Sequence, residues 1–161
     1  MTNNIAIIPV RTGSKRIKNK NFLDFQGFPL FYYTYLSAKK SKLFKKIIIS
    51  TESEKILKIM AKLKIEQSYV RPKKLAKDSS SLDDVCMHAL NFYEKKLKVR
   101  FDNICLLWAT SPLRDYNDIN SSFRLLHQNK LIDGVVGCGK YNYSPLCALT
   151  TNKKKIIKQI S

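Results

Sequence analysis

The amino-acid sequence predicts an α/β fold, a mostly parallel β-sheet with helices on both faces. The first observation is an alternation, since short apolar runs rich in β-branched residues are separated by longer segments of helical character. The second is the run 45–51, whose three isoleucines are too apolar for a half-exposed strand, so we expect a central parallel strand there. Strands that alternate with helices favour a parallel sheet. The chain shows no internal repeat or linker, so one α/β domain is expected over residues 1–161.

The composition excludes several classes of protein. Hydrophobic residues make up 44% of the 161 residues, which is too much for a disordered tail. No apolar run approaches the ~18 residues of a membrane span, and the amino terminus lacks the pattern of a signal peptide. The net charge of +18 favours polyanionic ligands. Because the lysines are spread along the whole chain, however, a general composition bias explains the charge better than nucleic-acid binding does.

The cysteines and histidines suggest no metal centre. The four cysteines, at 86, 105, 138 and 147, form no CxxC pair and fit no zinc template, so a reduced, cytoplasmic protein is expected. Cys105 and Cys138 lie in apolar runs and are expected to be small core residues. His88 lies two residues from Cys86 on an expected helix, where the two side chains do not share a face. His127 is expected at the surface.

The expected elements follow from periodicity and from start and stop signals. Strands are expected over 4–10, 45–51, 64–71, 101–108 and 132–139, with 146–150 a candidate for a sixth. Pro29 is expected to open a helix that continues over 30–42, and further helices are expected over 52–63, from the serines at 79–81 to 98, and over 115–130. Thr51 or Ser53 can cap the second helix. The apolar faces of the second and third helices are expected at Ile56, Ile59, Met60 and Leu63, and at Leu82, Val85, Ala89, Leu90 and Phe92.

A polar, basic loop follows the first strand, where an open α/β sheet binds its ligands. Gly13 permits a tight turn and a close approach to a ligand, and the backbone N–H groups around it can form an anion nest. The loop matches neither the Walker A pattern nor GxGxxG, and a basic surface turn is the alternative interpretation. The residues that can donate to phosphate are the cations Arg11, Lys15, Arg16 and Lys20 and the neutral Ser14 and Asn21.

Polar clusters follow two further expected strands. One consists of Arg71 and Pro72 with residues 77–81, and the other is Thr110-Ser111-Pro112-Leu113-Arg114. Taken separately, the serines are explained by a helix cap and the second cluster by a turn. Because parallel strands end at the same edge of a sheet, the three clusters together predict a site for base, ribose and phosphate.

These motifs, in this order, resemble the acylneuraminate cytidylyltransferases (CMP-sialic acid synthetases), which activate nine-carbon acidic sugars. The resemblance covers Ile5 to about Leu149, and Asn21 after Lys20 is similar to the nine-carbon branch rather than to the enzymes for the eight-carbon sugar Kdo. The matching pieces are residues 8–16, Lys20-Asn21, residues 50–56, residues 71–76, Ser81, residues 88–90 and residues 110–114.

The resemblance implies a Rossmann-like fold of the nucleotide-diphospho-sugar transferase type and a reaction. The anomeric hydroxyl of a 2-keto sugar acid attacks the α-phosphate of CTP, pyrophosphate leaves, and Mg²⁺ neutralises the phosphates. It implies catalytic roles for Arg11 and Lys20, with Lys15 beside them, at the charge that develops on the leaving group. Ser14 and Asn21 would orient phosphate or ribose, and Arg71 and Ser81 would hold the cytidine part. The implied nucleotide-binding residues are Arg11, Thr12, Gly13, Ser14, Lys15, Lys20, Asn21, Arg71, Ser81, Thr110 and Ser111.

The sequence departs from the family pattern in two places. Trp108-Ala109 stands where sialic acid enzymes often carry Gln-Pro, and we expect the tryptophan to fill core. The family's metal-binding aspartates and its dimerisation element lie beyond about Leu149, so the chain is expected to be incomplete at its carboxyl end and the metal ligands stay unassigned. Asp102, Asp115, Asp118 and Asp133 do not match those aspartates, and Asp118 is explained better as a helix-start residue.

The expected partners are CTP and an acidic nine-carbon sugar, with a homodimer for the complete protein and no membrane. Two other functions stay open. One is another sugar nucleotidyltransferase, such as a Kdo cytidylyltransferase. The other is a non-catalytic basic module that binds nucleotide or nucleic acid.

Overall fold

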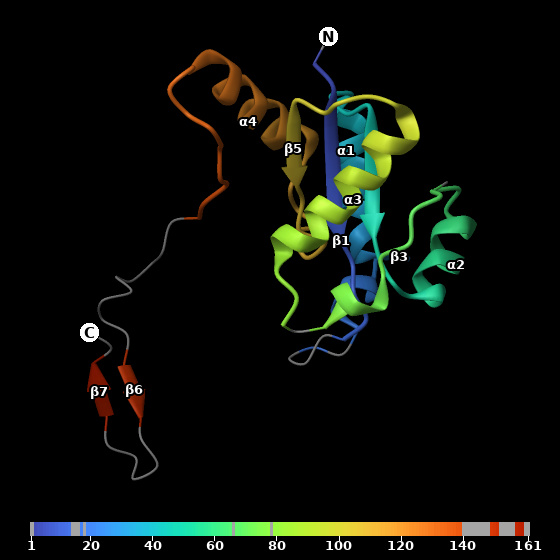
Figure 1. Cartoon of the computed structure of the whole chain (residues 1–161). Coiled ribbons are helices and arrows are strands. Elements are labelled where there is room, and N and C mark those ends of the chain that lie inside the picture. Colours follow the sequence, from blue (N-terminus) through green and yellow to red (C-terminus); the bar gives the residue numbers. More distant parts are fainter. Residues whose placement is uncertain are drawn as a thin grey trace.

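The centre of the molecule is a three-stranded parallel sheet in the order β4-β1-β5 (Figure 1). The computed structural model describes residues 2–13, 17, 19–65, 67–77, 79–139, 149–151 and 157–159. The strands are β1 (Asn4–Pro9), β4 (Lys46–Ser50) and β5 (Asn103–Leu106). The predicted parallel sheet is therefore confirmed. The expected central place of 45–51 is wrong, because β1 pairs on both sides and lies between the other two strands.

The strand register brings the carboxyl ends of the three strands to one edge of the sheet. Ile7 of β1 lies beside Ile48 of β4 and beside Leu106 of β5. Just past the strands, the Val10 N–H donates to the Ser50 carbonyl at 2.8 Å and the Leu107 N–H donates to the Ile7 carbonyl at 3.0 Å. The loops that leave β1, β4 and β5 therefore start beside one another.

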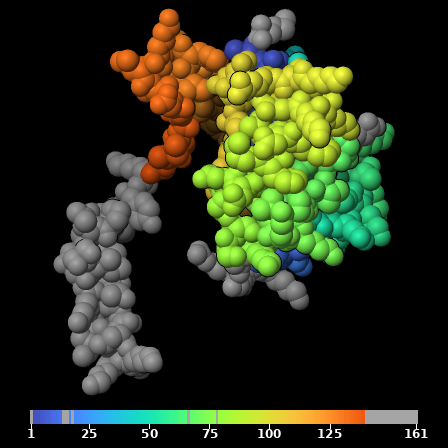
Figure 2. Space-filling model, in the orientation of Figure 1, coloured from blue at the N-terminus to red at the C-terminus, as the bar shows by residue number. Residues whose placement is uncertain are grey.

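Helices cover both faces of this sheet, as predicted. They are α1 (Leu30–Ser41), α2 (Glu54–Lys62), α3 (Leu82–Leu97) and α4 (Tyr116–Gln128). Because side chains alternate along a strand, Ala6 and Ile8 of β1 pack with α1, α2 and α4, while Ile5 and Ile7 pack with α3. Figure 2 shows the α3 side of the molecule, where this helix and its flanking loops form the near surface. No helix in the described ranges is long and apolar enough to cross a membrane.

Local capping chemistry sets the starts of three helices. The Ser53 hydroxyl accepts from the Ile56 N–H, and the Ser81 hydroxyl accepts from the Asp84 N–H at 3.0 Å. Asp115 and Asp118 form a reciprocal capping box at the start of α4, which confirms Asp118 as a helix-start residue. The helix bounds agree with the predicted ones to within about three residues.

The apolar faces of two helices were predicted almost correctly. Ile56 and Met60 of α2 are buried, as expected. On α3, Phe92 was expected inside and is partly exposed, whereas Tyr93 is fully buried against the sheet. The helical turn points position 93 toward Ala89 and Leu90, so the bulkier aromatic ring at that position fills the core.

The expected connector 22–28 contains a small hairpin of β2 (Asp24–Phe25) and β3 (Phe28–Pro29). Gln26 and Gly27 between the two strands both have positive φ, 50° and 86°, a conformation that favours glycine in tight hairpin turns. Pro29 then precedes α1 as its N-cap residue. The proline therefore marks the helix start, as expected.

The predicted strand 64–71 is wrong. Lys64 has a φ of 55°, and the chain from Gln67 to Arg71 runs extended beside β4 without joining it through a regular ladder. The Gln67 side chain takes the place of a paired strand, because its amide accepts from the Ile49 N–H at 2.9 Å and donates to the Ile49 carbonyl at 2.7 Å. The Arg71 N–H closes the segment by donating to the Thr51 carbonyl at 2.8 Å.

The predicted strand 132–139 is also wrong. These residues form no helix or strand, Val136 is 83% exposed, and Cys138, expected in the core, is exposed. Three glycines interrupt the apolar pattern, and glycine weakens a strand. Of the candidate strand 146–150, residues 146–148 lie outside the described residues. β6 (Leu149–Thr151) pairs antiparallel with β7 (Ile157–Gln159).

Candidate functional site

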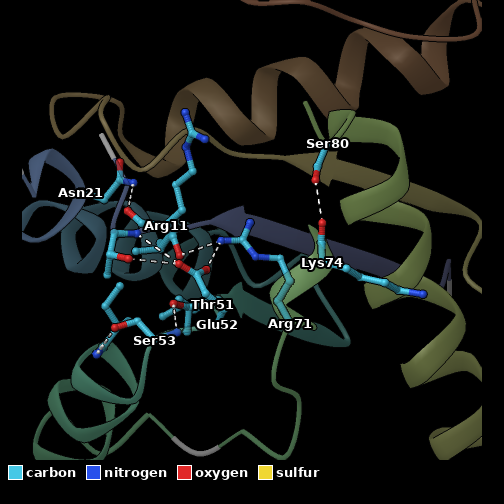
Figure 3. A network of polar contacts seen from close by, with 12 residues as sticks. Arg11, Asn21, Thr51, Glu52, Ser53, Arg71, Lys74 and Ser80 are labelled. Carbon is cyan, nitrogen blue, oxygen red and sulfur yellow. Dashed lines mark hydrogen bonds and ion pairs between the residues drawn. The ribbon is translucent and has the colours of Figure 1, made fainter. Parts of the chain in front are cut away.

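The chain that leaves β1 is fixed by side chains from other segments (Figure 3). Arg71 donates from Nη2 to the Val10 carbonyl at 3.3 Å. Asn21 donates from Nδ2 to the Arg11 carbonyl at 3.0 Å. Two consecutive carbonyls at the base of the loop are therefore held by residues from two other parts of the sequence.

A third contact holds the next residue of the loop. Glu52, two residues past β4, accepts with Oε1 from the Thr12 N–H at 3.3 Å and from the Thr12 hydroxyl at 3.2 Å. Its other oxygen, Oε2, forms an ion pair with Arg71 Nη2. The Arg71 side chain is only 3% exposed and that of Glu52 13%. The carboxylate therefore links the loop after β1 to the buried arginine beside β4.

The electrostatics of this pair favour the charged forms. Burial alone would raise the pKa of the Glu52 carboxyl, but hydrogen bonds from Arg71 and Thr12 and the arginine's positive charge outweigh it, so the pKa lies below its ordinary value. Glu52 is therefore ionised at neutral pH and compensates the charge of Arg71. The Arg71 Nε is also buried and makes no hydrogen bond within the described part of the chain.

The two residues expected to be catalytic lie near this network. Arg11 is partly buried, and in Figure 3 its side chain extends away from the Glu52–Arg71 pair. Lys20 is partly buried at the start of the short helix η1 (Lys20–Phe22), just before Asn21. The loop base therefore places both cations beside the carboxyl edge of the sheet.

The remaining loop residues are only partly described. Gly13 is exposed, its φ lies outside the left-handed region, and a Cβ there would meet open space. The described surroundings thus do not require glycine. Ser14 and Lys15, together with Arg16, lie outside the described residues.

The expected cytidine and nucleotide-side residues come from two further loops. Ser81 is the N-cap residue of α3, and its hydroxyl accepts from a backbone N–H. A hydroxyl that accepts in a cap still has its own O–H to donate. Thr110 and Ser111 are half-buried in the loop after β5. Sheet topology brings the loops after β1, β4 and β5 to one edge, and Arg71 reaches the same edge through the Val10 carbonyl. The predicted cluster at 71–72 and 77–81 does not follow a strand.

The loop after β5 is anchored by an arginine of its own motif. Arg114 donates from Nη2 to the Trp108 carbonyl at 2.8 Å and contacts the Thr34 hydroxyl of α1 at 3.4 Å. The Ser37 hydroxyl donates to the Arg114 carbonyl at 2.8 Å. Arg114 therefore fixes the loop to α1, which holds Thr110 and Ser111 in place.

Trp108 does not fill core, contrary to the expectation. Its side chain is 52% exposed, whereas Leu107 and Ala109 are buried on either side of it. An extended chain alternates its side chains between two sides, so burying Leu107 and Ala109 turns Trp108 outward.

No group of three or more His, Cys, Asp or Glu residues in the described part of the chain could hold a metal ion. Glu52, the carboxylate nearest the loop, is already engaged by Thr12 and Arg71. His88 instead contacts the Tyr69 hydroxyl at 3.2 Å. Cys105 packs at the edge of the core, and burial raises the pKa of its thiol to about 11.

Sequence reasoning missed Glu52 as a site residue. A signal was present, because an acid directly after an apolar strand lies at the edge where the sheet is expected to bind its ligand. Only the structure shows that this acid pairs with Arg71.

Comparison with known proteins places this chain in a family. The family model for cytidylyltransferases matches residues 5–155. The pseudaminic acid cytidylyltransferase of Campylobacter jejuni (strain 81-176) is 34% identical over 127 residues, which are 79% of this chain and 54% of that protein. The N-acylneuraminate cytidylyltransferase of Escherichia coli O18:K1:H7 is 35% identical over 143 residues, 86% of this chain and 32% of that protein. The chain thus spans about half the length of the first relatives it matches, or less.

A solved structure supports the fold. The structure of CMP:2-keto-3-deoxy-manno-octonic acid synthetase complexed with CTP superposes with a TM-score of 0.66 at 18% identity, covering 80% of this chain and 48% of that one. At this identity the likeness concerns the fold, a Rossmann-like α/β architecture.

Proposed function

This chain belongs to the cytidylyltransferase family, and from that premise we propose that it is the CTP-binding part of an enzyme that transfers CMP. The acceptor is the anomeric hydroxyl of a nine-carbon 2-keto sugar acid of the sialic, legionaminic or pseudaminic type, and pyrophosphate is released. The relatives named above, which act on pseudaminic acid and N-acylneuraminate, support this class of sugar.

One observation carries the proposal. Val10, Arg11 and Thr12, at the carboxyl end of the central strand, are each held by a side chain from elsewhere, namely Arg71, Asn21 and Glu52. Ligands of open α/β sheets bind at this edge. A loop base fixed in advance loses less conformational entropy when it binds a flexible triphosphate, and its donors need no reorganisation during the reaction.

The proposed roles follow from this placement. Arg11 and Lys20 bind the phosphates and stabilise the charge that develops on the leaving pyrophosphate, and Lys15 adds a further positive charge. Asn21 and Ser14 orient phosphate or ribose, and Gly13 contributes its backbone N–H group. Thr12, whose N–H and hydroxyl donate to Glu52, fixes the base of the loop. On the nucleoside side, Arg71 and the Ser81 hydroxyl supply donors for the cytidine part, and Thr110 and Ser111 complete this side of the site.

Mg²⁺ and dimerisation belong to the proposal for the complete protein. Mg²⁺ would neutralise part of the charge of the triphosphate, and its protein ligands stay unassigned. No step above therefore depends on the ion. The homodimer is tested by light scattering of the complete protein, for which a single-chain mass would contradict it.

The direct test is nucleotide binding by isothermal titration calorimetry, with CTP and ATP compared in the presence of Mg²⁺. We expect CTP to bind more tightly than ATP. Arg11→Ala should weaken CTP at least about tenfold, since a charge-assisted contact is worth about 1.5–3 kcal/mol. The matched control is Arg100→Ala, which removes an exposed arginine from the opposite edge of the sheet and should change binding less than about twofold. Equal binding of CTP and ATP would contradict the proposal.

The acceptor is tested by pyrophosphate release from CTP in the complete protein. Pseudaminic, legionaminic and N-acetylneuraminic acids are compared with Kdo. We expect release with at least one nine-carbon acid and little with Kdo. Release with Kdo alone would favour the eight-carbon alternative.

A further inference from the structure

We propose that Glu52 is a positioning residue that sets the loop after β1 and the Arg71 side chain in one binding geometry. The proposal rests on the proposed function for the identity of its ligand, a nucleoside triphosphate. It concerns a residue that does not touch the phosphates itself but acts through Thr12 and Arg71.

The geometry gives Glu52 two separate tasks. Oε1 accepts both the N–H and the hydroxyl of Thr12, and Oε2 pairs with Arg71. All the groups facing the carboxylate are therefore donors. Arg71 in turn reaches the Val10 carbonyl, two residues before Thr12, so the three side chains form a closed connection across the ends of β1 and β4.

The negative charge of Glu52 allows two possible roles to be distinguished by experiment. The loop that follows Thr12 is rich in cations, and an acid beside a triphosphate repels it by Coulomb's law. If Glu52 were only a nearby negative charge, its neutralisation would strengthen phosphate binding. If it holds the loop and Arg71 in place, the same change weakens binding. The sign of the effect therefore separates the two roles.

The choice of substitution follows from the donors. Gln at position 52 has nearly the same shape but only one acceptor oxygen, so its NH₂ must face either Thr12 or Arg71, both of which donate. Asp keeps the charge and both acceptors but is shorter by one methylene. Glu52→Gln should therefore disrupt the geometry more than Glu52→Asp.

A matched control is available two residues away. Glu54 is exposed at the start of α2, and Glu54→Gln removes one negative charge from the same region without touching Thr12 or Arg71. Its expected effect is unchanged or slightly tighter binding of polyanions.

The experiment measures the affinities of inorganic tripolyphosphate and of CTP by calorimetry for the wild-type chain and the three variants. We expect Glu52→Gln to weaken tripolyphosphate about tenfold, the scale of one lost charge-assisted hydrogen bond. Glu52→Asp should recover part of the loss, and Glu54→Gln should show none. Hydrogen exchange of the Thr12 amide should speed up in Glu52→Gln and not in Glu54→Gln. General destabilisation would speed up exchange at many amides, so a change confined to Thr12 separates the two causes.

Tighter or unchanged binding of tripolyphosphate in Glu52→Gln, as in Glu54→Gln, would overturn the proposal. If Glu52→Gln does not fold, the test uses Glu52→Asp. Tripolyphosphate binding as tight as in wild type would then show that the contacts of Glu52 with Thr12 and Arg71 are not needed, and it would overturn the proposal. Tripolyphosphate has no base, so these outcomes are independent of CTP preference. Equal affinity for CTP and ATP would contradict the proposed function. The role of Glu52 would still be decided by the affinities of the variants for tripolyphosphate.

Discussion

The two outer strands of the sheet are completed in different ways. Beside β4, the extended segment 67–71 is fixed at both ends, by the Gln67 amide on Ile49 and by the Arg71 N–H on Thr51. Within the described residues, β5 pairs with β1 alone, and its residue Ile104 is 44% exposed. Both outer strands end beside the candidate site, and within the described residues the β4 side supplies the mostly buried ion pair of Glu52 and Arg71.

This difference indicates where the site gains its rigidity. On the β4 side, Tyr69 is fully buried against α3, and this anchors the chain two residues before Arg71. On the β5 side, the loop is held by Arg114, which contacts the buried Thr34 of α1. We therefore expect substitutions on the β4 side to cost much more stability than exposed substitutions on the β5 side.

The largest effect is expected for Arg71→Met. This change removes the partner of a mostly buried carboxylate, and breaking a buried pair costs about 3–5 kcal/mol. The free energy of unfolding, from urea denaturation at pH 7, should fall by about that amount. A loss below about 1 kcal/mol would show that Glu52 is solvated rather than dependent on Arg71.

Acid should remove the contribution of the same pair. The pKa of Glu52 is lowered in the folded chain, below its ordinary value of 4.5, so the folded state binds this proton less readily than the unfolded state. The stabilisation is therefore present above about pH 4.5 and is lost as the pH falls through the lower folded pKa. The free energy of unfolding, measured by urea denaturation between pH 3 and 7, should fall less with acid in Glu52→Gln than in wild type. An equal pH dependence of this free energy in the two proteins would contradict the ion pair assigned to Glu52.

Gln67→Leu should have a smaller effect than Arg71→Met. It leaves the N–H and carbonyl of Ile49 and the Tyr69 carbonyl without their amide partner, and unsatisfied buried groups cost about 1–3 kcal/mol. We expect a loss of about 2 kcal/mol in urea denaturation. An unchanged free energy of unfolding in Gln67→Leu would mean that water replaces the amide beside β4.

The smallest effect is expected for Trp108→Ala, and its neighbour Leu107→Ala sharpens the comparison. Trp108 is half-exposed and should change stability by no more than about 0.5 kcal/mol, whereas the buried Leu107 should cost about 2–5 kcal/mol. The two free energies of unfolding are measured side by side. A larger cost at Trp108 than at Leu107 would reverse the orientation assigned to this loop.

The sequence predicted the elements whose signals are local. Ser53, Ser81 and Asp115 act as caps through hydrogen bonds to residues two or three positions away, so a short window contains the whole interaction. The strands β1 and β4 and the gathering of polar loops at one edge followed from apolar runs and parallel topology. The motif resemblance was confirmed by the family match over residues 5–155.

The errors arose where distant residues decide the structure. The segment 64–71 has strand composition, but the Gln67 side chain satisfies the edge of β4 in place of a backbone ladder. The exposure of Trp108 depends on which neighbours face the core. The role of Glu52 depends on Thr12, 40 positions away. Such contacts leave no periodic signal in the sequence.

The central claim is that the chain binds a pyrimidine triphosphate at the carboxyl edge of its sheet. It is tested most directly by the amide NMR spectrum of the chain titrated with CTP and, separately, with ATP. The account predicts that CTP shifts the amides of Val10, Arg11 and Thr12 and of the loop 108–111, and that ATP does so only at higher concentration. Shifts confined to the lysine-rich surface of α2, at Lys55, Lys58 and Lys62, and equal for both nucleotides would contradict it, because they would indicate binding by charge alone.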